Sequence, residues 1–128
     1  ALRMPAGIAA GAATIAATMG VRCVVAWTAS GMTARLLSKQ RLGPPVLGFS
    51  PSPASANRMA LFYGVYPHQM ESPDEAADML RAVDREVIEH GLADVGDLIL
   101  IVSGTKVIAP GETNTLMLHR VSERLKNE

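Results

Sequence analysis

Short apolar runs alternate with segments of helical periodicity along this chain of 128 residues. Five runs have the composition of strands: they are Val21–Trp27, Val46–Phe49, Val65–Met70, Asp97–Val102 and Thr115–Val121. The apolar runs are typical of buried strands, and the last run, in which polar and apolar residues alternate, is typical of a half-buried strand. The helical patterns before and between the first four runs cover Ala6–Met19, Met32–Gln40, Pro53–Tyr63 and Pro73–His90. Strands that alternate with helices of this length predict an α/β fold, a three-layer α/β/α domain with a mostly parallel sheet. No helix separates the last two strands, so the fifth is free to run antiparallel.

Glycine, proline and hydroxyl residues mark the expected helix ends. Glycine follows three of the helical patterns, at positions 20, 64 and 91, where its conformational freedom suits a C-terminal stop. Ser52 followed by Pro53 is typical of a helix start, with a hydroxyl N-cap before proline. Ser72 and Glu75 have the spacing of a capping box, which predicts that the last helix begins there.

The same signals place strands within the sheet. Pro67 cannot donate a ladder hydrogen bond, so Val65–Met70 suits an edge. The run Asp97–Val102 is apolar enough for a central position. Gly7 and Gly11 in the first helix are expected to permit its close approach to the sheet.

The composition fits one domain, covering residues 1–128, that is large enough to bury a core. Twelve basic and twelve acidic side chains give a formal net charge of zero, which lacks the basic surplus of a nucleic-acid binder. Hydrophobic residues make up 48% of the chain. A near-neutral domain of this kind is poorly protected against self-association, so we expect a homo-oligomer.

One cysteine, Cys23, lies inside an apolar run. It cannot form an internal disulfide, and a buried thiol fits a reducing, cytoplasmic compartment. The apolar segment Met4–Met19 follows Arg3 and invites comparison with a signal peptide, but it is too rich in alanine and glycine and too short to span a bilayer. We therefore expect a close-packing helix and no membrane association. The chain begins at Ala1 without an initiator methionine, so we expect a piece of a longer protein.

The turn after the first strand has the composition of an anion site. The site residues are Thr28, Ser30, Gly31, Met32 and Thr33. Hydroxyls and backbone N–H groups at a helix N-terminus can surround one phosphate, and the helix dipole favours it. The alternative is that Ser30 simply caps the helix, and the sequence leaves both open.

A second loop, Ser103–Asn114, follows the fourth strand. Ligands of parallel sheets bind beyond the carboxyl ends of the strands. If the first and fourth strands are neighbours, this loop meets the turn at one place. Gly111 would then let the backbone of this loop come close to the turn, and Thr113 could add a hydroxyl.

Other chemistry is weakly signalled. The chain has no glycine-lysine phosphate loop, no dinucleotide fingerprint and no Gly-x-Ser-x-Gly elbow. His68, His90 and His119 are scattered, without metal-ligand spacing to one another or to Cys23, so no metal site is predicted. Glu86 is expected on a solvated helix face, together with Glu89.

Two further assignments concern the neighbourhood of the turn. Arg35, Lys39 and Arg41 could balance a bound anion, although basic residues also suit a helix C-terminus. Trp27 could stack on a ligand, but core packing is the preferred interpretation. The sequence contains no credible acid–base pair, and we predict neither a catalytic residue nor a cofactor in this chain.

Several segments in order resemble the C-terminal domain of the pyruvate kinase family: they are Val24–Arg41, Pro45–Pro51, Asn57–Pro67, Gly96–Gly104 and Gly111–Thr115, the last followed by His119 and Val121. The resemblance covers about Ile8 to Val121. It implies a five-stranded mixed sheet whose last strand is antiparallel.

The resemblance also implies a regulatory role. In that family the glycolytic transfer of phosphate from phosphoenolpyruvate to ADP takes place on a (β/α)₈ barrel with Mg²⁺ and K⁺. Such a barrel needs ~250 residues and is absent from this chain. The C-terminal domain of that family binds phosphorylated allosteric effectors and contributes tetramer contacts. The matching effector turn is Thr28–Thr33, closed by the loop of Gly111, Glu112 and Thr113. Two positions depart from the family: Met32 stands where arginine is frequent, and Leu42 where proline is usual.

The function expected from the sequence is therefore that of a pyruvate kinase regulatory domain, not catalytic by itself. Its partners would be a phosphorylated effector or a plain sulfate or phosphate ion, further copies of the chain, and the missing barrel. The alternative is a stand-alone module that binds phosphorylated metabolites, or an oligomerisation domain, without kinase activity.

Overall fold

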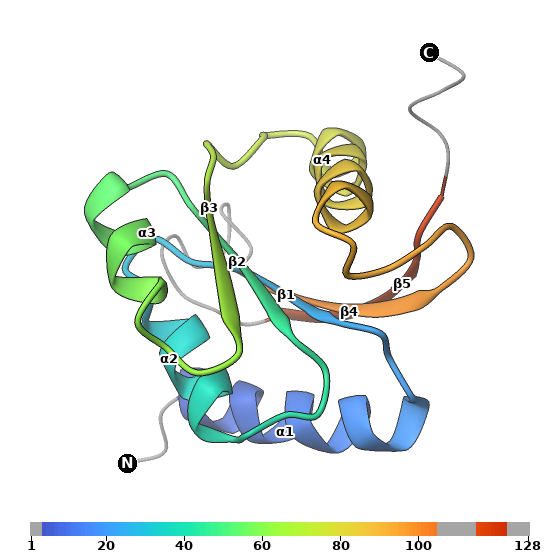
Figure 1. Ribbon diagram of the computed structural model, residues 1–128, viewed down its shortest axis with the longest axis horizontal. Coiled ribbons are helices and arrows are strands. Elements are labelled where there is room, and N and C mark those ends of the chain that lie inside the picture. The colour runs from blue at the N-terminus through green and yellow to red at the C-terminus, as the bar shows by residue number, and fades with distance from the viewer. Residues whose placement is uncertain (1–3, 105–114, 123–128) are drawn as a thin grey trace.

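The fold was determined as a computed structural model, which describes residues 4–104 and 115–122 (Figure 1). Its elements, in chain order, are α1 (Met4–Met19), β1 (Val24–Trp27), α2 (Met32–Lys39), β2 (Val46–Ser50), α3 (Pro53–Met59), β3 (Val65–Gln69), α4 (Ala76–Glu89), β4 (Leu98–Ser103) and β5 (Thr115–Arg120). All five expected strands are present.

The five strands form one sheet in the order β3-β2-β1-β4-β5. The first four are parallel, with Val25 opposite Leu47 of β2 and Ile101 of β4. β5 is antiparallel to β4. The mixed topology, the central position of β4 and the edge position of the Pro67 strand are all confirmed.

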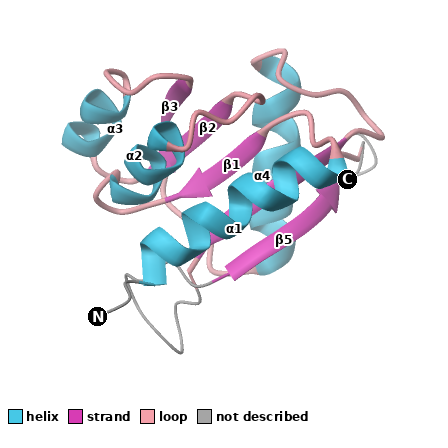
Figure 2. Ribbon diagram, turned by 90° about the horizontal axis from the view of Figure 1, so that it is seen from below, coloured by secondary structure: helices cyan, strands magenta, loops and turns pink. Residues whose placement is uncertain are grey.

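Helices cover both faces of the sheet, which makes three layers (Figure 1). α1, α2 and α3 lie on one face and α4 lies on the other, as the view from below also shows (Figure 2). Successive residues of β1 alternate between the two cores: Val24 and Ala26 join the α1 side, whereas Val25 and Trp27 join the α4 side. This alternation is the ordinary two-residue period of a strand.

The central strands are apolar throughout because both of their faces are covered. Every residue of β1 and β2 is buried. The edge strands β3 and β5 are only partly buried.

α1 is the close-packing helix expected from its alanine content. Ala9, Ala12 and Ala16 are buried against the sheet. A Cβ at Gly11 would lie 3.6 Å from Leu116 Cδ1, which is an ordinary contact, and a Cβ at Gly7 would meet nothing within 4 Å. The expected role of Gly7 is therefore wrong. Within the described part of the chain, no helix is long and apolar enough to cross a membrane.

α3 is shorter than its pattern suggested. Ser52 caps it as expected, accepting from Ser55 N at 3.2 Å. The helix ends at Met59, because the chain then tightens into turns in which Leu61 N donates to Arg58 O. The remaining residues before Gly64 are turn rather than helix.

The prediction of a capping box at the start of α4 is wrong. The N-cap is Glu75, whose backbone is extended and whose side chain makes no capping hydrogen bond. A capping box requires that glutamate inside the first helical turn, whereas here the helix begins only at Ala76.

The C-terminal end of α4 matches its prediction. Gly91 has φ +70, and two hydrogen bonds close the helix, from Gly91 N to Ile88 O and from Leu92 N to Val87 O. This pair of bonds is the Schellman arrangement. It fixes the backbone around His90, which is the C-cap residue.

Candidate functional site

The turn between β1 and α2 is held by its own hydroxyls. Gly31 is the N-cap and has φ 88, in the left-handed region. Gly31 N donates to Thr28 Oγ1 at 3.0 Å, and Met32 N donates to Ser30 Oγ at 3.2 Å. The two N–H groups expected to face an anion are therefore satisfied inside the turn.

This bonding does not consume the hydroxyls. A hydroxyl that accepts through a lone pair keeps its hydrogen for another acceptor. Ser30 is exposed and Thr28 is buried at the base of the turn, with 9% of its surface accessible. The interpretation of Ser30 as the N-cap is wrong because Gly31 holds that position, but the exposed Ser30 hydroxyl accepts from Met32 N and keeps its hydrogen to donate.

Residues from β2 and α3 fix the turn from behind. Ala29 O accepts hydrogen bonds from Ser50 Oγ at 3.1 Å and from Ser55 Oγ at 2.8 Å. Both hydroxyls belong to segments far from the turn in sequence. The turn is therefore positioned by β2 and α3, and not by α2 alone.

Arg58 brings a positive charge to this turn. Its Nη2 atom donates to Ser30 O at 3.1 Å and to Ser55 Oγ at 3.0 Å, and the residue is exposed. Met32, in the turn itself, is 48% exposed and uncharged. Arg58 was not predicted from the sequence, where the available signal was its spacing of three from Ser55 on one helix.

Two of the three basic residues named from the sequence lie at the far end of α2. Lys39 is the last residue of this helix of eight residues, whose length is about 12 Å, and Arg41 follows it. The guanidinium of Arg41 stacks over the ring of Tyr63 at 4.4 Å. Arg35 is exposed on α2.

The second loop starts at the expected place. β4 is the parallel neighbour of β1, with Val102 opposite Ala26. The turn after β1 and the loop after β4 therefore both begin at the carboxyl ends of these strands. Gly111, Glu112 and Thr113 themselves lie outside the described residues, and their part in the site stays a prediction.

Trp27 packs in the core, which confirms the preferred interpretation. Its ring stacks on Phe49 with centroids 4.3 Å apart and an interplanar angle of 13°. Only 7% of the residue is accessible. Its Nε1 atom has no hydrogen-bond partner among residues 4–104 and 115–122.

His119 anchors a buried carboxylate. Its Nε2 atom lies 2.8 Å from Asp84 Oδ1, and Asp84 is fully buried. Ser122 Oγ donates to Asp84 Oδ2 at 3.1 Å. Ser122, just after β5, therefore takes part in the contact with α4.

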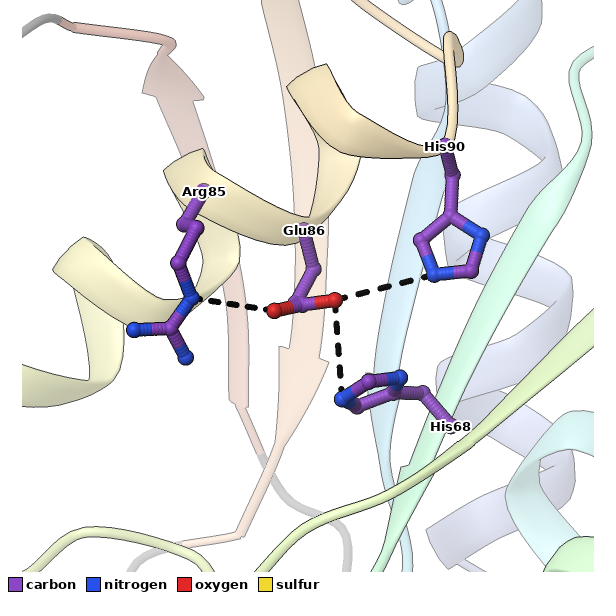
Figure 3. Close-up of polar contacts among 4 residues, drawn as sticks. All are labelled: His68, Arg85, Glu86 and His90. Carbon is purple, nitrogen blue, oxygen red and sulfur yellow. Dashed lines mark hydrogen bonds and ion pairs between the residues drawn. The ribbon is translucent and has the colours of Figure 1, made fainter.

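The other two histidines are not scattered, which corrects the sequence analysis. His68 Nε2 and His90 Nε2 lie 3.5 Å and 3.6 Å from the same Oε1 atom of Glu86 (Figure 3). Glu86 is 5% exposed, so its expected place on a solvated face is also wrong, whereas Glu89 is exposed. Glu86 and His90 are one helical turn apart on α4, whereas His68 comes from β3, and only the tertiary structure brings His68 to them.

Cys23 is buried at the start of β1, as expected. Burial raises the pKa of its thiol to about 12, the carboxylate of Asp97 adds to the rise, and Arg22 opposes it. A thiol with this pKa is not a nucleophile at neutral pH.

Comparison with known proteins identifies the domain. The family model described as "Pyruvate kinase, alpha/beta domain" matches residues 6–119. The chain belongs to this family. Pyruvate kinase of Sporosarcina psychrophila is 30% identical over 122 residues, and that of Lactococcus lactis subsp. lactis is 33% identical over 114 residues.

These matches also locate the chain within the family's proteins. They cover 95% and 89% of this chain but only 21% and 22% of the two relatives. The solved structure of Cryptosporidium parvum pyruvate kinase in complex with ADP superposes with a TM-score of 0.85 at 25% identity, over 94% of this chain and 24% of that one. The chain is therefore a pyruvate kinase C-terminal domain with the α/β fold expected from its sequence.

Proposed function

We propose that this chain is the regulatory domain of a pyruvate kinase, and that the turn at Thr28–Thr33 binds the phosphate of a small effector. The observation that carries the proposal is the meeting of hydroxyl donors and the Arg58 guanidinium on one turn at the carboxyl end of β1. Charge-assisted hydrogen bonds from a guanidinium are well suited to phosphate oxygens. Arg58 thus offers the charge that Met32 lacks.

The whole protein would transfer phosphate from phosphoenolpyruvate to ADP on a barrel outside this chain. Mg²⁺ and K⁺ would act on that barrel and not here. Effector binding on this domain would regulate the barrel's activity and would require no catalytic group in the chain.

Exposed apolar side chains support a second part of the proposal, contacts between copies. Leu61, Tyr63 and Tyr66 are 84%, 64% and 44% exposed, and all lie in or before the edge strand β3. A concentration of exposed apolar residues on one segment is typical of an interaction surface.

Calorimetry on the full-length protein tests effector binding. The ligands are fructose bisphosphate, ribose phosphate, AMP and inorganic sulfate. Heat from the sugar phosphates but not from AMP or sulfate would define the effector class. No heat from any of the four would contradict binding and leave oligomerisation.

Ser30→Asp is the sharpest variant for locating the site. Aspartate is a favourable residue beside a helix N-terminus, so folding is retained, while its carboxylate repels a phosphate. We expect binding to weaken at least about 100-fold, equivalent to roughly 3 kcal/mol. Gly31→Asp is a poorer test because φ 88 strains any side chain there and its Cβ would lie 3.4 Å from Met59 Cγ.

Two comparisons complete the design. Gln40→Glu puts a carboxylate at the exposed far end of the same helix and should leave affinity unchanged. Arg58→Gln should weaken binding about tenfold or more, whereas Lys39→Gln, at an exposed cation that ends α2, should not. Equal affinities in the Ser30 and Gln40 variants would place the effector elsewhere.

The parent reading frame separates this proposal from a stand-alone module. A barrel-sized segment of ~200 residues or more upstream of Ala1 supports the kinase. A frame without one would favour a module that binds phosphorylated metabolites without kinase activity.

A further inference from the structure

His68, Glu86 and His90 converge on one point beside the edge of the sheet, on the face covered by α4. His68 belongs to β3, Glu86 to α4, and His90 caps that helix. Figure 3 shows both imidazoles directed at the same carboxylate oxygen. The three ligand atoms lie within 4.8 Å of one another.

The distances do not describe ordinary hydrogen bonds. The two Nε2 atoms lie 3.5 Å and 3.6 Å from Glu86 Oε1, whereas an N–H···O bond usually spans about 2.7–3.2 Å. Two ligands of one tetrahedral zinc ion, each about 2.1 Å from the metal, lie ~3.4 Å apart. The two distances to Glu86 Oε1 are therefore close to the separation of two ligands on one ion.

Local structure holds the three side chains in place. Glu86 and His90 are four residues apart and so share a helix face. The hydrogen bond from His90 N to Glu86 O, 2.9 Å long, continues the helix to His90, and the Schellman bonds fix its end. The ring of His68 packs edge-on against Phe49 at 5.4 Å, and against His90 at 5.8 Å.

Arg85 orients the carboxylate. Its Nε atom donates to Glu86 Oε2 at 3.0 Å, which leaves Oε1 facing the imidazoles (Figure 3). Groups that hold a ligand in this way are common around metal sites. The guanidinium also offsets the negative charge of Glu86.

We propose that His68, Glu86 and His90 bind a divalent transition metal of the Zn²⁺ class. Two imidazoles and one carboxylate are a known zinc ligand set, with a fourth position open to water. His90 has a side chain that is 35% exposed, so an ion can enter from solvent. Mg²⁺ and Ca²⁺ prefer several oxygen ligands and are disfavoured by two imidazoles.

Such an ion would join the edge strand β3 to the C-terminal end of α4. The cluster is separate from the phosphate turn, and the proposal does not depend on effector binding. Its test also separates it from any metal on a catalytic barrel.

The experiment measures Zn²⁺ binding to the full-length protein by competition with a chromophoric chelator, in excess Mg²⁺ and K⁺. We expect one Zn²⁺ per chain that is lost, or weakened at least about 100-fold, in His68→Gln and in His90→Gln, because loss of an outer partner alone costs about 10–100-fold. Glu89→Gln, exposed on the same helix, is the matched control and should bind as the unmodified protein does. Co²⁺ in place of Zn²⁺ should give the intense visible absorption of a tetrahedral site.

Hydrogen exchange locates the ion. In the unmodified protein, Zn²⁺ should slow amide exchange in the peptides that contain β3 and the end of α4. In His68→Gln and in His90→Gln, Zn²⁺ should leave the exchange of these peptides unchanged. His90→Gln, at an exposed helix end, keeps the test valid if His68→Gln fails to fold. Absence of any Zn²⁺ site, or equal affinity and stoichiometry in the His90 variant and the unmodified protein, overturns the proposal.

Discussion

At the scale of single residues, burial changes the chemistry of side chains that look ordinary in sequence. Glu86 and Asp84 are on one helix, and both are buried carboxylates. Each has a histidine beside it that comes from a strand, His68 for Glu86 and His119 for Asp84. A buried carboxylate requires such partners because the loss of hydration is costly. Polar residues of α4 are therefore part of its packing.

Cys23 gives a pH dependence that can be measured. The folded protein holds the thiol proton up to about pH 12, against an ordinary pKa of 9.0. The thiol therefore contributes its full stability below pH 9, and this contribution falls as the pH rises from 9.0 toward 12. Between pH 8 and pH 10 the free energy of unfolding should drop by about 1 kcal/mol more in the unmodified protein than in Cys23→Ala.

Urea denaturation at the two pH values measures this difference. The cavity left by Cys23→Ala lowers stability equally at both, so only the change with pH matters. Alkylation of the native protein should also leave the Cys23 peptide unmodified. Parallel pH dependences in the two proteins would contradict the raised pKa.

At the scale of elements, helix ends decide which side chains meet. α4 ends at a glycine in the left-handed region, and this fixes His90 next to Glu86. α2 begins at another such glycine, and this leaves the Ser30 hydroxyl over the Met32 N–H group. Both sites of interest thus lie at helix ends whose geometry a single glycine permits.

Alanine at two glycines should have opposite effects on stability. Gly91→Ala places a side chain at φ +70, with nothing within 4 Å of the new Cβ, so the cost is backbone strain of about 1–2 kcal/mol. Gly7→Ala lies in an exposed part of α1, also with open space around its Cβ, and should stabilise by about 0.5–1 kcal/mol. Denaturant midpoints of the two variants provide the measurement. Destabilisation by both would mean that hidden contacts, and not backbone conformation, set the effect.

At the scale of the whole molecule, the two faces and two edges of the sheet have different surroundings. The faces are covered by helices, whereas β3 and β5 are the outer strands of the sheet. The segment before and in β3 exposes Leu61, Tyr63 and Tyr66. This edge is the surface that we assign to contacts between copies.

Leu61→Glu tests that assignment. Leu61 is 84% exposed, so the substitution leaves folding intact while placing a charge in the contact. The dissociation constant of the oligomer should rise about tenfold or more, as for loss of roughly 1.4 kcal/mol. Sedimentation of the full-length protein measures it. Val95→Glu, at a residue 48% exposed elsewhere on the surface, should change nothing, and an unaltered oligomer in both variants would assign the contact to another surface.

Much of the fold was predictable because its determinants are local. Apolar runs such as Leu98–Val102 become strands since their pattern suits burial on both faces, and Ser52 caps α3 through a residue three positions on. The start of α4 was predicted wrongly because a local spacing alone does not fix the backbone conformation. Ser72 and Glu75 have the right spacing, but spacing does not determine whether Glu75 adopts helical dihedrals, and it is extended.

The sequence by itself determined the family, the alternation of strands and helices, and the hydroxyl composition of the turn at Thr28–Thr33. Tertiary structure alone decided which distant side chains face one another. Arg58 reaches the turn because α3 packs beside it, and His68 reaches Glu86 because α4 covers one face of the sheet. Such contacts depend on how layers stack, and no short-range pattern along the chain encodes the distance between a strand and a helix that packs on it.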